Sequence, residues 1–383
     1  MSKMVVKQET KSMTGNDAAA YAALFAKPQV IAAYPITPQT TIVENLSQYV
    51  DEGLLDAEFV IVESEHSALA ACMGAAWSGV RTFTATSSQG LLYMAENVFW
   101  TGYGRLPIIM PVVNRCLAPG WNIWPDFQDS MAFRDAGWIQ MYTKNNQEVF
   151  DTVLQSFIIS ESKDIALPSM PCLDGFIISH TTGQVQLPDA EEAYEFVGPY
   201  NDPVIELDVN NPWAFGAMTG PDQYGKNRKD LMEAMERAKT KIVDVHKEFS
   251  ERFGRSYGNG LVEPYGDDVA DLTIVSLGTI GDETHEAIDQ LTAEGLSVNA
   301  LRIRTFRPFP EKDIVEFAKK NNKLLVIDRS ASFGHGGQLG IEVEAVLKRT
   351  NVDTPVKKLI RGLGGEDVPY TKIMKDAKEA LKE

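Results

Sequence analysis

EFVIVESEHSALAACMGAAWSG, residues 58–79, joins a short apolar stretch to an alanine-rich stretch through an acidic turn. The first six residues are rich in β-forming side chains, and the run from His66 to Gly79 has the composition of a helix. A strand that passes through a turn into a helix is typical of one β–α unit of a parallel sheet. Glu63 and Glu65 fall at the junction, where a helix N-terminus favours a carboxylate.

The same pattern recurs through the first half of the chain. Three more apolar, strand-like runs alternate with helix-like runs: QVIAAYP (29–35), RTFTATS (81–87) and PIIMPVV (107–113). NQEVFDTVLQSFIISES (146–162) has the periodicity of an amphipathic helix. Strands that alternate with helices predict an α/β fold, in which a parallel sheet is covered by helices on both faces.

Changes in composition divide the chain. Residues 1–256 are predicted to form one domain, with an extended arm at about 183–235 that is rich in Pro, Asn, Asp and Gly. YGNGLVEPYGDD (257–268) is predicted to be a linker. Residues 269–383 repeat the α/β pattern on a smaller scale, which predicts a second domain.

The bulk composition argues against several classes of protein. The 383 residues carry a formal net charge of −17, which disfavours nucleic acid as a partner. No apolar stretch is long enough to span a membrane and the N-terminus has no apolar signal segment, so we expect a cytoplasmic protein. Histidine is scarce, with five residues, which argues against a multi-histidine metal site. Three separate cysteines, Cys72, Cys116 and Cys172, are too few to hold an iron–sulfur cluster alone.

Three side chains stand at the carboxyl ends of predicted strands, the edge at which open α/β sheets bind ligands. Thr37 is fixed between two prolines in YPITPQT and presents a hydroxyl suited to bind a substrate. Arg115 offers a guanidinium for a carboxylate, and Glu65 offers a carboxylate for a heterocycle nitrogen. Each has an ordinary alternative: a stiff helix-entry turn, a surface arginine paired with an acid, and a helix-start residue.

The loop that follows Arg115 and the predicted strand 107–113 has an unusual composition. WNIWPDFQDSMAFRD (121–135) contains two Trp, two Phe and three Asp. Such a mixture is typical of a packed lid or of an active-site wall. The candidate residues of this substrate-pocket loop are Trp124, Asp126, Phe127 and Asp129.

Two glycine-containing motifs are not interpreted as phosphate sites. LDGF (173–176) lacks the leading glycine of a diphosphate–magnesium motif and is predicted to be a turn. FGHGGQLG (333–340) has Leu339 where a dinucleotide loop needs its third glycine. A nicotinamide site is therefore not expected, and His335 is assigned a structural role.

Taken together and in order, these motifs resemble those of a known family. YPITPQTT, ESEHSA, TFTATSSQGL, NR, the run D-x-x-D-S-M-A-x-R-D-x-G-W and LDGF are similar to the α subunit of pyruvate:ferredoxin oxidoreductase, in the 2-oxoacid:ferredoxin oxidoreductase family. RIRTFRPFP, LLVIDRS and GLGGE resemble its second domain. The resemblance implies a thiamine-diphosphate-binding fold, with a pyrimidine-binding domain and a smaller transketolase C-terminal-like domain.

The resemblance also implies a reaction and a set of partners. Enzymes of this family convert a 2-oxoacid such as pyruvate and coenzyme A to acyl-CoA and CO2, or run the reverse synthesis, and pass electrons to ferredoxin. Thiamine diphosphate is shared with a β subunit, which holds the diphosphate and Mg²⁺. Coenzyme A is associated with a γ subunit, and the [4Fe-4S] clusters with the β and δ subunits. The cysteine count agrees with that division.

Residue roles follow from the matching motifs. The resemblance implies that Glu65 bonds the aminopyrimidine ring and promotes the imino tautomer, whose nitrogen takes the proton from the thiazolium C2. It implies that Thr37 hydrogen-bonds the substrate and that Arg115 binds its carboxylate. Gln89 and Gly90 are expected to line the cofactor end of the sheet.

The choice of substrate stays open at the level of sequence. Trp121, Trp124 and Phe127 add aromatic bulk beside the predicted carboxylate site, where pyruvate enzymes of the family have other residues. A larger 2-oxoacid is an alternative to pyruvate: phenylglyoxylate, a branched-chain oxoacid or 2-oxoglutarate. The other interpretation of the aromatic loop is that it packs against a partner subunit. Thr37 argues against oxalate, because an oxalate enzyme of the family has an arginine at that position. An alternative of another class is a non-catalytic scaffold subunit.

Overall fold

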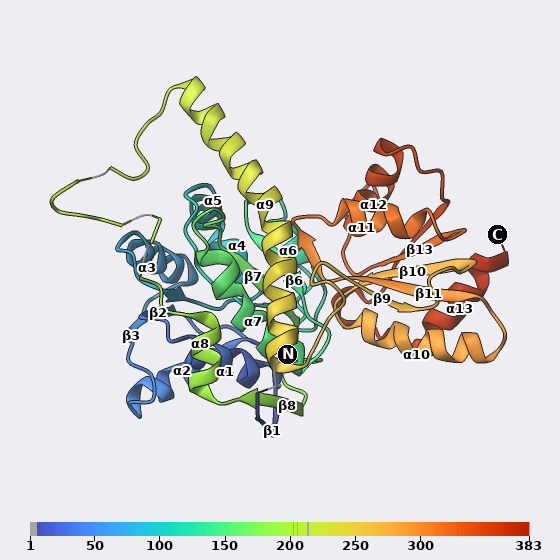
Figure 1. Cartoon of the computed structure of the whole chain (residues 1–383), viewed down its shortest axis with the longest axis horizontal. Coiled ribbons are helices and arrows are strands. Elements are labelled where there is room, and N and C mark those ends of the chain that lie inside the picture. The colour runs from blue at the N-terminus through green and yellow to red at the C-terminus, as the bar shows by residue number, and fades with distance from the viewer. Residues whose placement is uncertain (1–5, 202, 205, 213, 383) are drawn as a thin grey trace.

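The computed structural model describes residues 6–201, 203–204, 206–212 and 214–382. Figure 1 shows two lobes: a first lobe coloured blue to yellow, formed by β1 to α9, and a second lobe coloured orange to red, formed by β9 to α13. Among the helices of these ranges, none combines the length and the apolar surface that a membrane crossing requires.

The first lobe is built on a sheet whose main strands run parallel. β2 (Val30–Ala33) lies between β3 (Glu58–Ile61) and β4 (Thr82–Phe83). Isolated parallel bridges continue the sheet to a second set of strands in the order β5, β7, β6. Those three strands are β5 (Val112–Asn114), β6 (Ile139–Tyr142) and β7 (Ser169–Asp174). The predicted α/β class with a parallel sheet is confirmed.

Helices follow the strands as the β–α pattern predicts. They are α1 (Gly15–Ala26), α2 (Thr40–Asp51), α3 (Glu65–Trp77), α4 (Ser88–Tyr93), α5 (Ala95–Tyr103), α6 (Gln128–Met131) and α7 (Asn146–Glu161). In α3, Ser64 is the N-cap, and its hydroxyl accepts from the main-chain N–H of Ser67 at 3.3 Å. Glu65 is therefore the first residue of the helix that the opening sequence motif predicts.

The sequence predicts that α7 is amphipathic, with an exposed polar face. In the structure most of its polar residues are buried together with its apolar residues. α9 packs along this helix, and α9 and the residues just after it supply partners for them. Asp151 forms an ion pair with Arg255, and Gln155 lies 3.2 Å from the ring of His246. A buried polar face of this kind is stable only because its groups are hydrogen-bonded.

The second lobe is a five-stranded sheet in the order β14, β13, β10, β11, β9. β10 (Leu272–Leu277), β11 (Val298–Ile303), β13 (Leu324–Asp328) and β14 (Val356–Ile360) are parallel, and β9 (Val262–Gly266) is an antiparallel edge strand. The remaining elements are α10 (Ile280–Ala293), α11 (Glu311–Ala318), α12 (Gln338–Arg349), the 3₁₀ turn η1 (Leu363–Gly365) and α13 (Tyr370–Lys382).

The two lobes are joined by one strand pairing and by buried ion pairs. β12 (Thr305–Arg307) leaves the second lobe and pairs antiparallel with β6 of the first. Arg302 and Arg304 both donate to Glu148 Oε1, at 2.9 and 2.8 Å, and all three side chains are buried. Burial alone would raise the pKa of Glu148, but the two guanidinium groups overcome it and hold the pKa below its ordinary value.

Two connections differ from the sequence prediction. The predicted linker at 257–268 contains β9, which is an integral strand of the second sheet. The predicted arm at 183–235 contains β8 (Gly183–Pro188), which pairs with β1 (Gln8–Met13), and also α8 (Ala190–Val197) and the start of α9 (Pro221–Phe253). The extended part is therefore confined to the segment between α8 and α9, which Figure 1 shows as a wide loop and which contacts the end of α3 through Phe215 and Trp77.

Candidate active site

Glu65 lies against the turn that begins α4. Its side chain is buried, with 8% of its surface exposed. A Cβ on Gly90 would lie 2.7 Å from Glu65 Oε1 and 2.7 Å from Thr86 Oγ1. Glycine at position 90 thus permits the carboxylate to approach the turn, and a side chain there would push it away.

Arg115 extends from the end of β5 toward the same turn. Its Nη1 donates to the carbonyl of Thr37 at 2.7 Å, and its Nη2 donates to Gln89 Oε1 at 2.9 Å. The side chain is buried, and burial lowers the pKa of Arg115 while the nearby charges of Asp129 and Glu65 oppose that shift. The predicted residues Thr37, Glu65, Gln89, Gly90 and Arg115 are therefore gathered at one place.

Among the described residues, the charge of Arg115 has no ion-pair partner. Within the described part of the chain, no carboxylate oxygen lies within 4.0 Å of its guanidinium nitrogens, and its Nε is buried without a hydrogen-bond partner. Both acceptors that it does have are neutral oxygens. A buried guanidinium held only by neutral groups is suited to bind an anionic ligand.

Further polar atoms around this turn are buried and unused. Thr86 Oγ1 and Ser87 Oγ have no hydrogen-bond partner among the described residues, although both residues are fully buried. Ser88 has a φ of 47°, in the left-handed region that non-glycine residues seldom adopt. Unsatisfied buried polar atoms beside a carboxylate and a guanidinium indicate a binding site.

The loop residues predicted with the site separate into two groups. Asp129 contacts the site, because its Oδ2 accepts from the main-chain N–H of Arg115 at 3.0 Å. Phe127, which is 1% exposed, instead packs against Tyr142 with ring centroids 4.8 Å apart, in the core between the lobes. Asp126 accepts from the main-chain N–H of Gly364 in the second lobe at 3.0 Å.

Trp124 also belongs to the contact with the second lobe. Its half-exposed side chain packs against Phe176, with ring centroids 4.9 Å apart, and lies so close to Gly365 that a Cβ there would clash. It lines a cavity of about 500 Å³ between the lobes, together with Arg329. Trp121, by contrast, stands over the site, with its ring 5.7 Å from the Arg115 guanidinium.

Sequence reasoning missed Ser88, Thr86 and Asn114. Ser88 and Thr86 lie on the turn against which Glu65 packs, and Asn114 precedes the site arginine. Their position at or just after the ends of predicted strands is a usable signal, since that edge of the sheet binds ligands. The unusual φ of Ser88 has no signature in the sequence.

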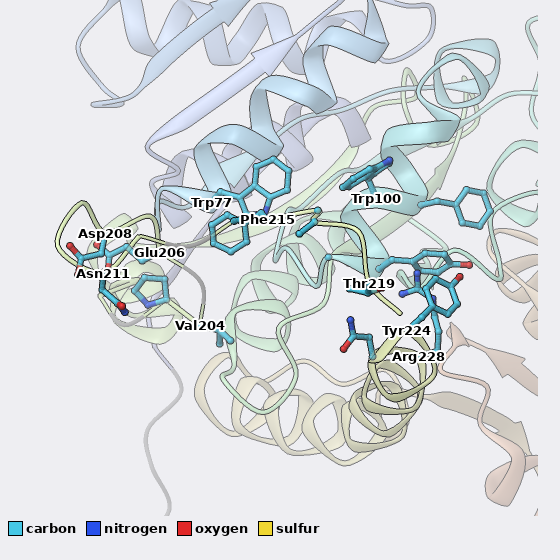
Figure 2. Close-up of a pocket in the computed structure, with 18 residues that line it drawn as sticks. Trp77, Trp100, Val204, Glu206, Asp208, Asn211, Phe215, Thr219, Tyr224 and Arg228 are labelled. Atoms are coloured by element: carbon cyan, nitrogen blue, oxygen red, sulfur yellow. The ribbon is translucent and has the colours of Figure 1, made fainter. Parts of the chain in front are cut away.

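A larger cavity of about 980 Å³ lies elsewhere (Figure 2). It is lined by α5, α9, the extended segment and Trp77, which stacks on Phe215 with ring centroids 5.6 Å apart. The guanidinium of Arg228 lies 3.8 Å from the Tyr103 ring and 4.4 Å from the Tyr224 ring. Trp77 ends α3, about 18 Å along that helix from its first residue, so this cavity is separate from the candidate active site.

The parallel sheet of the first lobe, with a smaller α/β lobe attached, defines a thiamine-diphosphate-binding fold. The family model described as pyruvate flavodoxin/ferredoxin oxidoreductase, thiamine diphosphate-binding, matches residues 21–247. A model described as pyruvate:ferredoxin oxidoreductase core domain II matches residues 270–373. The chain belongs to the pyruvate flavodoxin/ferredoxin oxidoreductase family, a family of oxidoreductases.

Curated relatives with related functions align with this chain over almost its full length. Pyruvate synthase subunit PorA of Methanocaldococcus jannaschii is 50% identical over 361 residues, which cover 94% of this chain and 92% of the relative. Ketoisovalerate oxidoreductase subunit VorA of Pyrococcus horikoshii is 44% identical over 93% of this chain and 90% of the relative.

Solved structures share the fold. The 2-oxoglutarate:ferredoxin oxidoreductase from Magnetococcus marinus superimposes with a TM-score of 0.76 at 19% identity, over 98% of this chain and 66% of that longer chain. A split gene transketolase, described as an inactive β4 tetramer, superimposes with a TM-score of 0.59 at 14% identity, over 97% of this chain and 99% of that chain. At these identities the likeness concerns the fold alone.

Proposed function

We propose that this chain is the subunit of a pyruvate:ferredoxin oxidoreductase that holds the aminopyrimidine half of thiamine diphosphate and the carboxylate of the substrate. The observation that carries the proposal is the placement of two buried side chains against the turn that begins α4. They are the unpaired guanidinium of Arg115 and the carboxylate of Glu65. The high identity to pyruvate synthase subunits supports pyruvate and coenzyme A as the substrates.

The residues present fit the cofactor. Thiamine diphosphate, when bound, supplies the nucleophilic carbon that allows a 2-oxoacid to lose CO2. Glu65 would hold a proton shared with a nitrogen of the aminopyrimidine ring, at its buried Oε atoms. Thr86 and Ser87 offer unsatisfied hydroxyls on the adjoining turn, and Gly90 lets the carboxylate lie against that turn. Gln89 would line the cofactor side while it orients Arg115.

Arg115 would bind the substrate carboxylate through the N–H groups of Nη1 and Nη2 that the bonds to Thr37 and Gln89 leave unused. Its two neutral acceptors fix the plane of the guanidinium without neutralising it. Thr37, whose carbonyl accepts from Arg115, is an exposed residue and would add a hydrogen bond to the substrate. The substrate would thus be oriented by this chain alone, at the edge of its sheet.

The rest of the machinery is proposed to lie on partner chains. Within the described residues, no three His, Cys, Asp or Glu side chains are grouped so that they could hold a metal ion. Following the resemblance to the family, we assign the diphosphate and Mg²⁺ to a β subunit, the [4Fe-4S] clusters to β and δ subunits, and coenzyme A to a γ subunit. Such an enzyme would deliver electrons to ferredoxin and work in the cytoplasm.

The chemistry is tested by Glu65→Gln in the assembled complex, with Glu63→Gln as the matched control. Glu63 is two residues away, and its carboxylate accepts from the Ser67 hydroxyl at the surface. We expect the Glu65 variant to assemble and to lose pyruvate-dependent ferredoxin reduction, while the control stays active. Full activity of the Glu65 variant would show a scaffold subunit and would refute the proposal.

A branched-chain oxoacid is the second candidate substrate, since ketoisovalerate oxidoreductase subunits are 42–44% identical to this chain. A panel of pyruvate, 2-oxoisovalerate, 2-oxoglutarate and phenylglyoxylate, each assayed with coenzyme A, decides between them. We expect the highest kcat/KM with pyruvate. A higher value with 2-oxoisovalerate would reassign the substrate and leave the chemistry unchanged.

A further inference from the structure

Asp129 is a fully buried carboxylate that accepts four hydrogen bonds. Its Oδ2 accepts from the main-chain N–H groups of Ser88 and Arg115, both at 3.0 Å. Its Oδ1 accepts from Asn114 Nδ2 and from the main-chain N–H of Ser130, both at 2.8 Å. Four donors satisfy the carboxylate without any guanidinium or ammonium partner.

The two donors at Oδ2 come from two different turns. Arg115 follows β5 and carries the proposed substrate-binding guanidinium, whereas Ser88 begins α4 and leads into Gln89 and Gly90. A single oxygen atom therefore joins the substrate side of the site to the cofactor side. The bond from Arg115 Nη2 to Gln89 Oε1 closes a ring that passes through Asp129.

We propose that Asp129 is the positioning residue that fixes the guanidinium of Arg115 and the turn at 88–90 relative to each other, so that one carboxylate sets the distance between substrate and cofactor. The proposal rests on the proposed function of the site. Asp129 lies behind the main chain of both turns and acts through their N–H groups. Its role is thus to hold the geometry of the groups that touch the ligands.

The four donors explain why a carboxylate is needed. An asparagine at position 129 has the same size and shape as the aspartate. Its NH2 group, however, would replace either Oδ1 or Oδ2, and in both places it would face two N–H donors. In either orientation one pair of donors would lose its acceptor in a buried setting: the two turns on one side, or Asn114 and the main chain of Ser130 on the other. The first orientation releases the turns, and the second displaces the side chain that holds them. Burial raises the pKa of Asp129 to about 7, and the charge of Asp126 adds to that shift.

The test compares Asp129→Asn with Asp126→Asn in the assembled enzyme. Asp126 is also buried and also accepts from two main-chain N–H groups, those of Gln128 and Gly364, but it serves the contact between the lobes. We expect Asp129→Asn to raise the KM for the oxoacid about tenfold or more, to weaken binding of thiamine diphosphate in titrations, and to leave the KM for coenzyme A unchanged. Asp126→Asn is expected to lower only the unfolding temperature.

A double-mutant cycle separates positioning from general stability. If Asp129 acts through Arg115, then Asp129→Asn will cause little further rise in KM once Arg115 has been changed to Ala. Additive effects of the two changes on KM, or a pattern for Asp129→Asn identical to that of Asp126→Asn, would overturn the proposal. If Arg115→Ala itself left KM unchanged, the proposed function would fail instead.

A milder variant decides the matter if Asp129→Asn does not assemble. Asn114→Ala removes one donor at Oδ1 and leaves the two main-chain donors at Oδ2 in place. We expect a smaller rise in the KM for the oxoacid, of about two- to fivefold, with coenzyme A unaffected. An unchanged KM for the oxoacid in this variant would count against the positioning role.

Discussion

The guanidinium of Arg115 donates to the main-chain carbonyl of Thr37 at 2.7 Å, and not to the threonine hydroxyl. The carbonyl orients the arginine, and the exposed hydroxyl side of Thr37 is left available for a ligand. Because a carbonyl oxygen is neutral, this bond fixes the guanidinium without consuming its charge. The two proposed substrate-binding roles can therefore be tested separately by mutation at these two positions.

Arg115→Gln removes the charge and keeps a polar side chain of similar reach. We expect the KM for the oxoacid to rise about 10- to 100-fold, because a charge-assisted hydrogen bond contributes roughly 1.5–3 kcal/mol. The change in kcat is expected to be smaller, since the carboxylate is bound before and during the reaction. Steady-state kinetics of the assembled complex measure both constants.

Thr37→Ala is the companion to that experiment. It keeps the carbonyl that orients Arg115 and removes only the hydroxyl. The KM for the oxoacid is expected to rise less than in Arg115→Gln, by about two- to tenfold. An effect as large as that of the arginine variant would mean that the hydroxyl, and not the guanidinium, is the principal substrate ligand.

The positions of the main site residues could be predicted because they follow strands. Thr37, Arg115 and Gly90 each follow a predicted strand, and the ends of parallel strands meet at one edge of a sheet. Glu65 was predictable as a helix-start carboxylate, and Ser64 does cap that helix. The spatial grouping of these residues is thus a consequence of topology.

The remaining features depend on tertiary contacts without a local signal. β12 pairs with a strand of the other lobe, and three residues of sequence do not identify such a partner. Phe127 and Asp126 looked like pocket residues by composition, but the second lobe covers them. The extended arm was predicted too long because Pro and Asp also occur at helix starts, as at Pro221 in α9.

Glu148 links the lobes, and its loss would leave Arg304 buried without its carboxylate partner, while Arg302 would keep only Glu263. Glu148→Gln is expected to destabilise the fold by about 3–5 kcal/mol, the range seen when one partner of a buried ion pair is removed. Calorimetric unfolding of the assembled enzyme would measure this loss. Glu233→Gln is the control, because its exposed pairing with Arg237 contributes only about 0.2–0.5 kcal/mol.

His246 makes stability depend on pH in the acid range. Its Nε2 accepts from the main-chain N–H of Tyr257 at 2.9 Å, so the ring is neutral, and burial followed by the charge of Arg304 lowers its pKa to about 3. Between about pH 6.5 and 3 the unfolded chain takes up a proton that the folded chain does not. Stability is therefore expected to fall as pH is lowered through this window and to be insensitive to His246 above it.

His246→Gln removes the titrating ring and keeps a side chain that accepts a hydrogen bond. The variant should be less stable than the parent at neutral pH, because its fit in the buried site is poorer. Its stability should also decline less steeply between pH 6.5 and 4, as measured by denaturant unfolding. Parallel curves for the two proteins would assign the acid sensitivity to other groups, such as Glu148, whose lowered pKa acts in the same direction.

Trp121 is the side chain through which this chain would limit the size of its substrate. Its ring stands 5.7 Å from the Arg115 guanidinium while 79% of the residue remains exposed. A cation–π contact at an exposed site contributes only about 0.5–1 kcal/mol, so Trp121→Ala should leave the KM for pyruvate nearly unchanged.

The space released beside the carboxylate site should admit a branched side chain and raise kcat/KM for 2-oxoisovalerate relative to pyruvate, by about two- to tenfold. Trp124→Ala is the control, because that ring packs against Phe176 and not over the arginine. An equal change in both variants would place the limit on substrate size in the contact between the lobes.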